Sequence, residues 1–122
     1  MPAIENTSDN PVLARLRELV IETDSEFVAE LIDIYINTTP TQIQTLAKAL
    51  DTQDHRMLTI AAHTLKGNSL NLGATQLGAV SFKFEELGRS NAPISAANSI
   101  KEIANEFEKV KEILLSFKQN KY

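Results

Sequence analysis

Several residue and segment types are absent or rare in this chain. It has no cysteine, which excludes disulfides and thiolate metal sites and fits a reducing compartment. Its four glycines and four prolines stand mostly at the edges of periodic segments, as helix punctuation does. No apolar run approaches membrane-spanning length, and the polar start MPAIENTSDN lacks the apolar core of a signal peptide. We therefore expect a cytoplasmic protein without a membrane segment, and the starting Met1 favours a free-standing one.

The charge is modest and unevenly spread. The 122 residues carry a net charge of −4, which argues against nucleic acid as a partner. Residues 1–60 hold four basic and ten acidic side chains, whereas residues 61–122 hold eight basic and six acidic ones. This asymmetry fits either ordinary scatter or electrostatic steering of a partner.

The apolar residues recur at helical spacing, and no β-type alternation with hairpin signals is present. The sequence predicts an all-α fold in a single domain over residues 1–122. We expect an antiparallel up-and-down four-helix bundle over about 40–117, because the connections are short. One or two short N-terminal helices, within about 10–38, should cap one end of the bundle.

Local signals place the helix ends. Asn10–Pro11, Ser25, Thr39–Pro40, Asp54 and Thr75 read as helix starts, and Asn91 and Pro93 open the last helix. The helix from Ser25 should present one apolar face, which consists of Phe27, Leu31, Ile34 and Tyr35.

The segment AAHTLKGNSLNLG, residues 61–73, contains a glycine where a helix is expected. An apolar stripe passes through Gly67 without a break in phase, and Gly73 is the better helix stop. Glycine inside a helix lowers stability by about 1 kcal/mol relative to alanine, so we expect Gly67 to have a role that compensates for this loss. The stripe consists of Leu58, Ala61, Ala62, Leu65, Ser69 and Leu72.

On the same helical wheel, His63 lies on the outer face. Gly67 follows it by one turn and removes any side chain that would crowd it, and Lys66 lies beside it. A neutral imidazole is a nucleophile that can attack a phosphoryl group, and a nearby ammonium would stabilise the product. A chance surface histidine and a glycine that allows close helix packing are the simpler alternatives.

This stretch resembles the histidine phosphotransfer (HPt) domains of multistep phosphorelays. The matching residues run from Ala62 through Ser69 and continue with Leu72, Gly73 and Ala74, and the likeness covers roughly residues 25–90. The resemblance implies a four-helix bundle whose exposed histidine, here His63, carries a phosphoryl group between the aspartates of response-regulator receiver domains. Lys66 would offset the phosphoryl charge and Gly67 would give access.

The resemblance also implies what the chain lacks. It would have no ATP-dependent kinase activity and no cofactor of its own, because Mg²⁺ belongs to the receiver. Its partners would be receiver domains or a hybrid histidine kinase. From charge and hydropathy we expect no nucleic acid or membrane partner, and we expect the chain to be a monomer.

Two positions depart from the family pattern. Asn68 stands where a small serine or alanine is common, which looks tolerable, and Glu85 stands where many members carry glutamine. Glu85 is a candidate acceptor for His63 Nδ1–H, which would leave Nε2 free to react. The alternative, a solvated glutamate, is slightly favoured by the sequence alone. The candidate docking residues for a receiver are Thr59, Ile60, Leu70, Phe82 and Arg89, although Arg89 fits a solvent-exposed helix-end cation equally well.

Two other classes of function remain as rivals. A passive helical interaction module would share the fold but would not need a glycine at position 67. A DNA-binding helix-turn-helix is disfavoured because Glu85 and Glu86 would stand on its recognition helix. The second histidine, His55, lies two turns from His63 and cannot share a metal with it.

Overall fold

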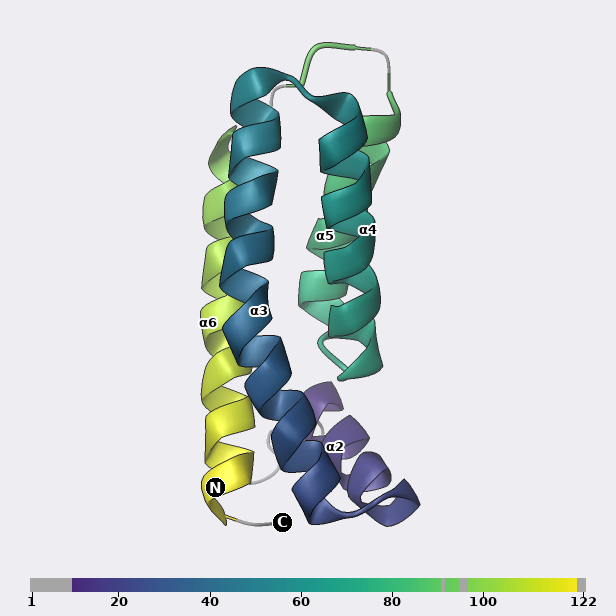
Figure 1. The fold of residues 1–122 in the computed structure, drawn as a ribbon, viewed down its shortest axis with the longest axis vertical. Helices are drawn as coiled ribbons and strands as arrows, with labels where there is room; N and C mark the ends of the chain where they lie inside the picture. The colour runs from purple at the N-terminus through teal and green to yellow at the C-terminus, as the bar shows by residue number, and fades with distance from the viewer. Residues whose placement is uncertain (1–9, 91, 95–96, 121–122) are drawn as a thin grey trace.

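A computed structural model shows five helices in the described residues, which are 10–90, 92–94 and 97–120. They are α2 (Pro11–Glu22), α3 (Ser25–Thr52), α4 (His55–Asn71), α5 (Thr75–Arg89) and α6 (Ala97–Asn120). Helices α3 to α6 run antiparallel in chain order and form the expected four-helix bundle (Figure 1). Helix α2 covers the end of the bundle where α3 begins. None of the described helices is long and apolar enough to cross a bilayer.

Side-chain caps fix several helix starts. The side chain of Asn10 accepts hydrogen bonds from the backbone amides of Val12 and Leu13, which confirms the predicted start of α2. Asp54 caps α4 in the same way. At α3 the prediction was off by one residue, because Asp24 rather than Ser25 accepts the hydrogen bond from the Phe27 amide.

The predicted helix break at Thr39–Pro40 is wrong. Pro40 lies inside the 28-residue helix α3, so the bundle begins at Ser25 and only α2 lies outside it. Proline lacks the amide hydrogen that would bond to the carbonyl of Ile36. The continuous buried face of α3 on both sides of Pro40 offsets that loss, and Figure 1 shows α3 bending along its length. This buried face consists of Val28, Ile32, Tyr35, Thr39, Leu46 and Ala49.

This buried face differs from the apolar face that the sequence predicts at the start of α3. Phe27 and Ile34 are 45% and 58% exposed, whereas Val28 and Ile32 are buried. The predicted start of the last helix is also wrong for the described residues, because α6 begins at Ala97 and Pro93 lies in the connection before it. Asn91 lies outside the described residues.

Helices α4 and α5 are in close contact at two glycines of α5. A Cβ at Gly88 would lie 2.7 Å from the Thr59 backbone nitrogen, and one at Gly78 would lie 2.8 Å from Leu70 Cγ. Between these two contacts, Lys66 and His63 of α4 reach Glu85 of α5. The two helices therefore hold a fixed antiparallel register along the seam that contains His63.

Candidate functional site

His63 lies in the middle of α4, as predicted, and its side chain is 64% exposed. Its neighbours in the predicted apolar stripe, from Leu58 to Leu72, are all buried. Nδ1 lies 2.9 Å from Glu85 Oε2. Because an ionised carboxylate only accepts hydrogen bonds, this contact requires Nδ1 to carry the proton. In the neutral ring the lone pair is then on Nε2, for which the described residues provide no hydrogen-bond partner.

Glu85 is buried, with 3% of its side chain exposed, so the solvated glutamate that the sequence slightly favoured is wrong. Its two carboxylate oxygens face three basic side chains. Lys66 Nζ lies 2.7 Å from Oε1, and Arg89 donates to Oε2 at 2.7 Å, alongside His63. Lys66 lowers the pKa of Glu85 most, burial opposes it, His63 adds to the lowering, and the net pKa is about 2. Glu85 is therefore an anion at neutral pH.

Lys66 lies next to His63 on α4 but does not extend freely into solvent. Its side chain is 22% exposed, because the ammonium is paired with Glu85 and lies 5.1 Å from the centroid of the Phe82 ring. The ammonium is thus held on the α5 side of His63. The predicted contact between Lys66 and a phosphoryl group on His63 stays a prediction.

Gly67 is inside α4, as predicted, and its surroundings are empty. A Cβ built there meets no heavy atom within 4 Å, apart from the helix's own backbone. Close helix packing, the simpler alternative for this glycine, is therefore wrong at position 67, although it holds for Gly78 and Gly88. Within the part of the chain that the structure describes, no side chain packs close enough to require a glycine at position 67.

The candidate docking residues differ in exposure. Ile60, Leu70 and Phe82 are 55%, 48% and 46% exposed, so each offers apolar surface to a partner. Thr59 is half-buried, and its hydroxyl donates to the His55 carbonyl. Arg89 is 64% exposed on its side chain, but its ion pair with Glu85 makes it part of the network at His63, a role that the sequence did not predict.

A buried hydrogen bond beneath the site was missed by the sequence analysis. Tyr35 of α3 and Ser69 of α4 are both buried, and their hydroxyl oxygens lie 2.8 Å apart. A polar serine within the predicted apolar stripe was the available signal, because a buried hydroxyl needs a partner. This contact ties α4 to α3 one to two turns from His63.

Other polar groups lie away from this cluster. His55 Nε2 lies 2.9 Å from the Ala92 carbonyl oxygen, so this histidine links the start of α4 to the connection before α6. Among the residues that the structure describes, no group of three or more histidine or acidic side chains could hold a metal ion.

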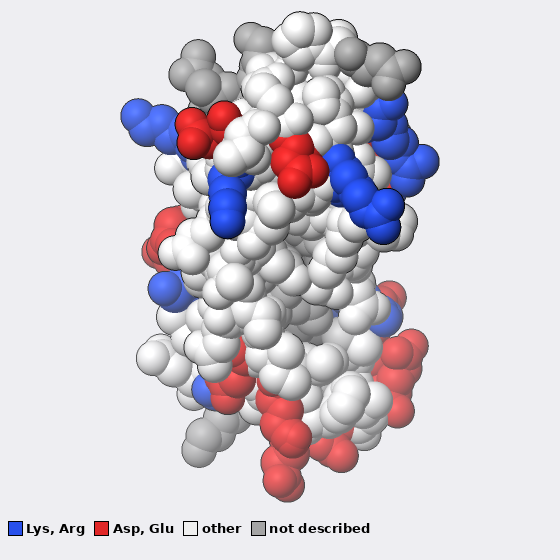
Figure 2. Space-filling model, turned by 45° about the horizontal axis from the view of Figure 1, so that its top comes forward, with Lys and Arg blue, Asp and Glu red and all other residues white. Residues whose placement is uncertain are grey.

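Acidic and basic side chains are unevenly distributed along the bundle axis. On the face shown in Figure 2, acidic side chains gather at the end where α2 lies, and lysines and arginines are more frequent towards the other end. The acidic residues of α2 and of the first part of α3, including Asp24 before it, are Glu18, Glu22, Asp24, Glu26, Glu30 and Asp33.

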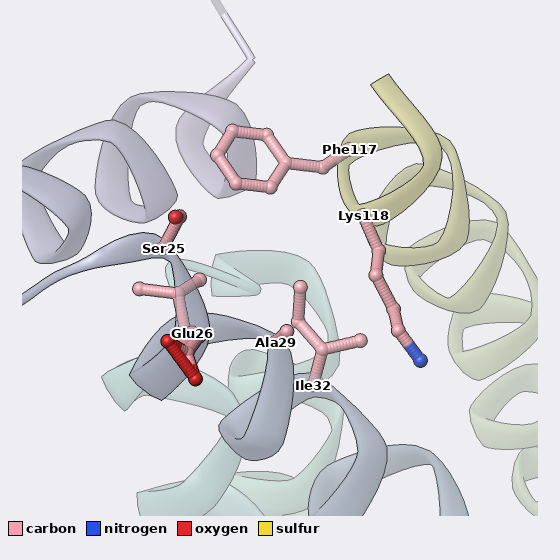
Figure 3. A pocket seen from close by; sticks show the side chains of 7 residues that line it. Ser25, Glu26, Ala29, Ile32, Phe117 and Lys118 are labelled. Carbon is pink, nitrogen blue, oxygen red and sulfur yellow. The ribbon is translucent and has the colours of Figure 1, made fainter. Parts of the chain in front are cut away.

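A cavity of about 300 Å³ lies between the start of α3 and the end of α6 (Figure 3). Its lining is mostly apolar, with the ring of Phe117 and the side chain of Ile32 among its walls. None of the residues around His63 lines it, so it does not belong to the candidate site.

Comparisons with known proteins agree with this geometry. The Hpt domain family model matches residues 30–113. The chain is 29% identical over 99 residues to the phosphorelay intermediate protein rdeA of Dictyostelium discoideum, a match that covers 81% of this chain and 39% of that protein. The chain therefore matches about two fifths of that relative's length.

Among solved structures, the histidine-containing phosphotransfer protein B (HptB) of Pseudomonas aeruginosa PAO1 has a similar fold. The TM-score is 0.80 at 26% identity, and the match covers 88% of this chain and 92% of that one. Since the family model spans more than half of the sequence and includes His63, the chain belongs to the Hpt domain family.

Proposed function

We propose that this protein is a phosphocarrier that relays a phosphoryl group between receiver aspartates through Nε2 of His63. The observation that carries the proposal is the state of the His63 ring. Its Nδ1 is hydrogen-bonded to a buried carboxylate, while its Nε2 points away from that partner on an exposed side chain. A ring held in this way presents a lone pair to an incoming phosphoryl group without first losing a proton.

The transfer step balances with the residues at the site. Nε2 donates its lone pair to phosphorus, and the bond between phosphorus and the aspartyl oxygen of the receiver breaks. The electron pair of that bond leaves on the aspartate as a carboxylate. The proton on Nδ1 stays between the ring and Glu85, whose negative charge stabilises the positive phospho-imidazole ring. Transfer to a second receiver reverses these steps.

Lys66 and Gly67 support the same reaction in different ways. The Lys66 ammonium lies beside the His63–Glu85 pair and would offset the charge of the phosphoryl group. Gly67 leaves open space on the outer face of α4 one turn from His63. A receiver domain needs such space to bring its aspartate within bonding distance of Nε2.

The remaining parts of the proposal concern partners and setting. The protein acts as a single domain over residues 1–122 and as a monomer in the cytoplasm, with response-regulator receivers or a hybrid histidine kinase as partners. It has no ATP-dependent kinase activity, and it binds no nucleic acid or membrane. It carries no cofactor of its own, since the receiver binds the Mg²⁺ used in the transfer.

The proposal is tested by mixing the protein with a panel of phosphorylated receiver domains and following the phosphoryl label. We expect label to move to the wild-type chain and to be absent from the His63→Gln variant. The rival passive module would bind its partner equally well with and without His63. Binding without transfer from any receiver, by a correctly folded protein, would therefore support the rival.

A further inference from the structure

The ring of Phe82 is partly exposed to solvent and also lies near a charged side chain, that of Lys66. Part of its ring is open to solvent, with 46% of the residue exposed, and the Lys66 ammonium lies 5.1 Å from its centroid. Phe82 therefore contacts a charged group of the site and is also available to a partner. A residue that only contributes docking surface would lack the first of these contacts.

The position of Lys66 depends on both of its contacts. Glu85 Oε1 attracts the ammonium at 2.7 Å, and the face of the Phe82 ring attracts it as a cation. Together they leave the lysine side chain 22% exposed, whereas Lys109 on α6 is 70% exposed although it too has an acidic partner. One acidic partner is thus compatible with an exposed lysine, and the ring is the additional feature at Lys66.

We propose that Phe82 is a positioning residue, which holds the Lys66 ammonium beside His63 and holds it more firmly once a receiver covers the ring. This inference rests on the phosphocarrier function proposed above. An attraction between a cation and an aromatic ring strengthens when water is removed from it. A receiver that docks over Phe82 removes that water, so docking itself would fix the lysine just as the phosphoryl group arrives.

The first test separates positioning from docking by steady-state kinetics, with an excess of an unphosphorylated second receiver that discharges His63 so that the chain turns over. Phe82→Leu keeps an apolar side chain at the surface but removes the aromatic face, and Phe82→Tyr keeps the ring. We expect Phe82→Leu to lower kcat for transfer from a phosphorylated receiver about fivefold or more. Phe82→Tyr should stay close to wild type. The matched control is Phe27→Leu on α3, an equally exposed phenylalanine at 45%, which should leave kcat unchanged.

The second test needs no phosphoryl transfer. The Lys66 ammonium lies 5.1 Å from the centroid of the Phe82 ring, so the NMR signals of the adjoining ε-methylene protons should be displaced upfield by the ring current. The displacement should vanish in Phe82→Leu, persist in Phe82→Tyr and increase when an unphosphorylated receiver is added. If Phe82→Leu raises only KM, or if the Lys66 signals show no ring-current displacement, Phe82 is a docking contact and the inference is wrong.

Failure of this inference differs from failure of the proposed function. If wild-type protein accepts no phosphoryl group from any receiver, the proposed function fails whatever the Phe82 variants do. If wild type accepts it and Phe82→Leu does so with an unchanged kcat, only the positioning role of Phe82 is overturned.

Discussion

Substitution of Gly67 should raise stability and lower activity together. Alanine at this position would add a methyl group that meets no atom within 4 Å, on a backbone that is already helical. Replacing glycine by alanine inside a helix gains about 0.5–1 kcal/mol, since alanine loses less backbone entropy on folding. For a domain of this size that gain raises Tm by about 2–5 °C.

A larger side chain makes the test sharper. Glutamine is a good helix former, so Gly67→Gln should still gain about 0.5 kcal/mol of unfolding free energy. The side chain would nevertheless occupy the space beside His63 that a receiver needs. We expect receiver-dependent transfer to fall modestly in Gly67→Ala and by at least an order of magnitude in Gly67→Gln.

The assay combines urea unfolding followed by circular dichroism with label transfer from a phosphorylated receiver. Gly88→Ala is the matched control, because its Cβ would lie 2.7 Å from the Thr59 nitrogen and 2.9 Å from the His55 oxygen. That variant should lose roughly 1–3 kcal/mol through overpacking. Destabilisation by Gly67→Ala, or full transfer activity in Gly67→Gln, would refute the reasoning about clearance.

Two further predictions concern groups beneath the site. Because the pKa of Glu85 falls from 4.5 to about 2 on folding, its ionised form should stabilise the protein above pH 4.5. That contribution should be lost as the pH falls from 4.5 towards 2, so the stability difference between wild type and Glu85→Gln, measured by urea unfolding, should shrink over that range. A stability difference that stays constant over this pH range would contradict the ion-pair account. As a control, Glu86→Gln at an exposed neighbouring position should change the stability little. Tyr35→Phe should cost about 1–3 kcal/mol of unfolding free energy by leaving the buried Ser69 hydroxyl without its partner, and adding Ser69→Ala should recover part of the loss. Fully additive losses in that double-mutant cycle would mean that the two hydroxyls do not interact.

The sequence was sufficient for features that depend on one helix at a time. The phase of the stripe around Leu58 and Leu65 predicted that His63 and Gly67 face outwards, and the structure agrees. The caps at Asn10 and Asp54 were also predictable, because a cap is a contact between residues two or three positions apart.

Features that depend on packing between helices were not predictable in this way. Pro40 reads locally as a helix start, and only the burial of α3 along its whole length keeps that helix continuous. The burial of Glu85 follows from the register of α5 against α4, which is set by close contacts such as that of Gly88 with Thr59. A helical wheel describes one helix and does not contain that register.

The chemical identity of the phosphorylated atom tests the central claim most directly. The wild-type protein would be phosphorylated by a receiver, examined by phosphorus and nitrogen NMR, and then mixed with a second, unphosphorylated receiver. We predict an acid-labile, alkali-stable phosphoryl group on Nε2 of His63, which the second receiver removes. A phosphoryl group on Nδ1 or on another residue, or one that no receiver can remove, would contradict the account.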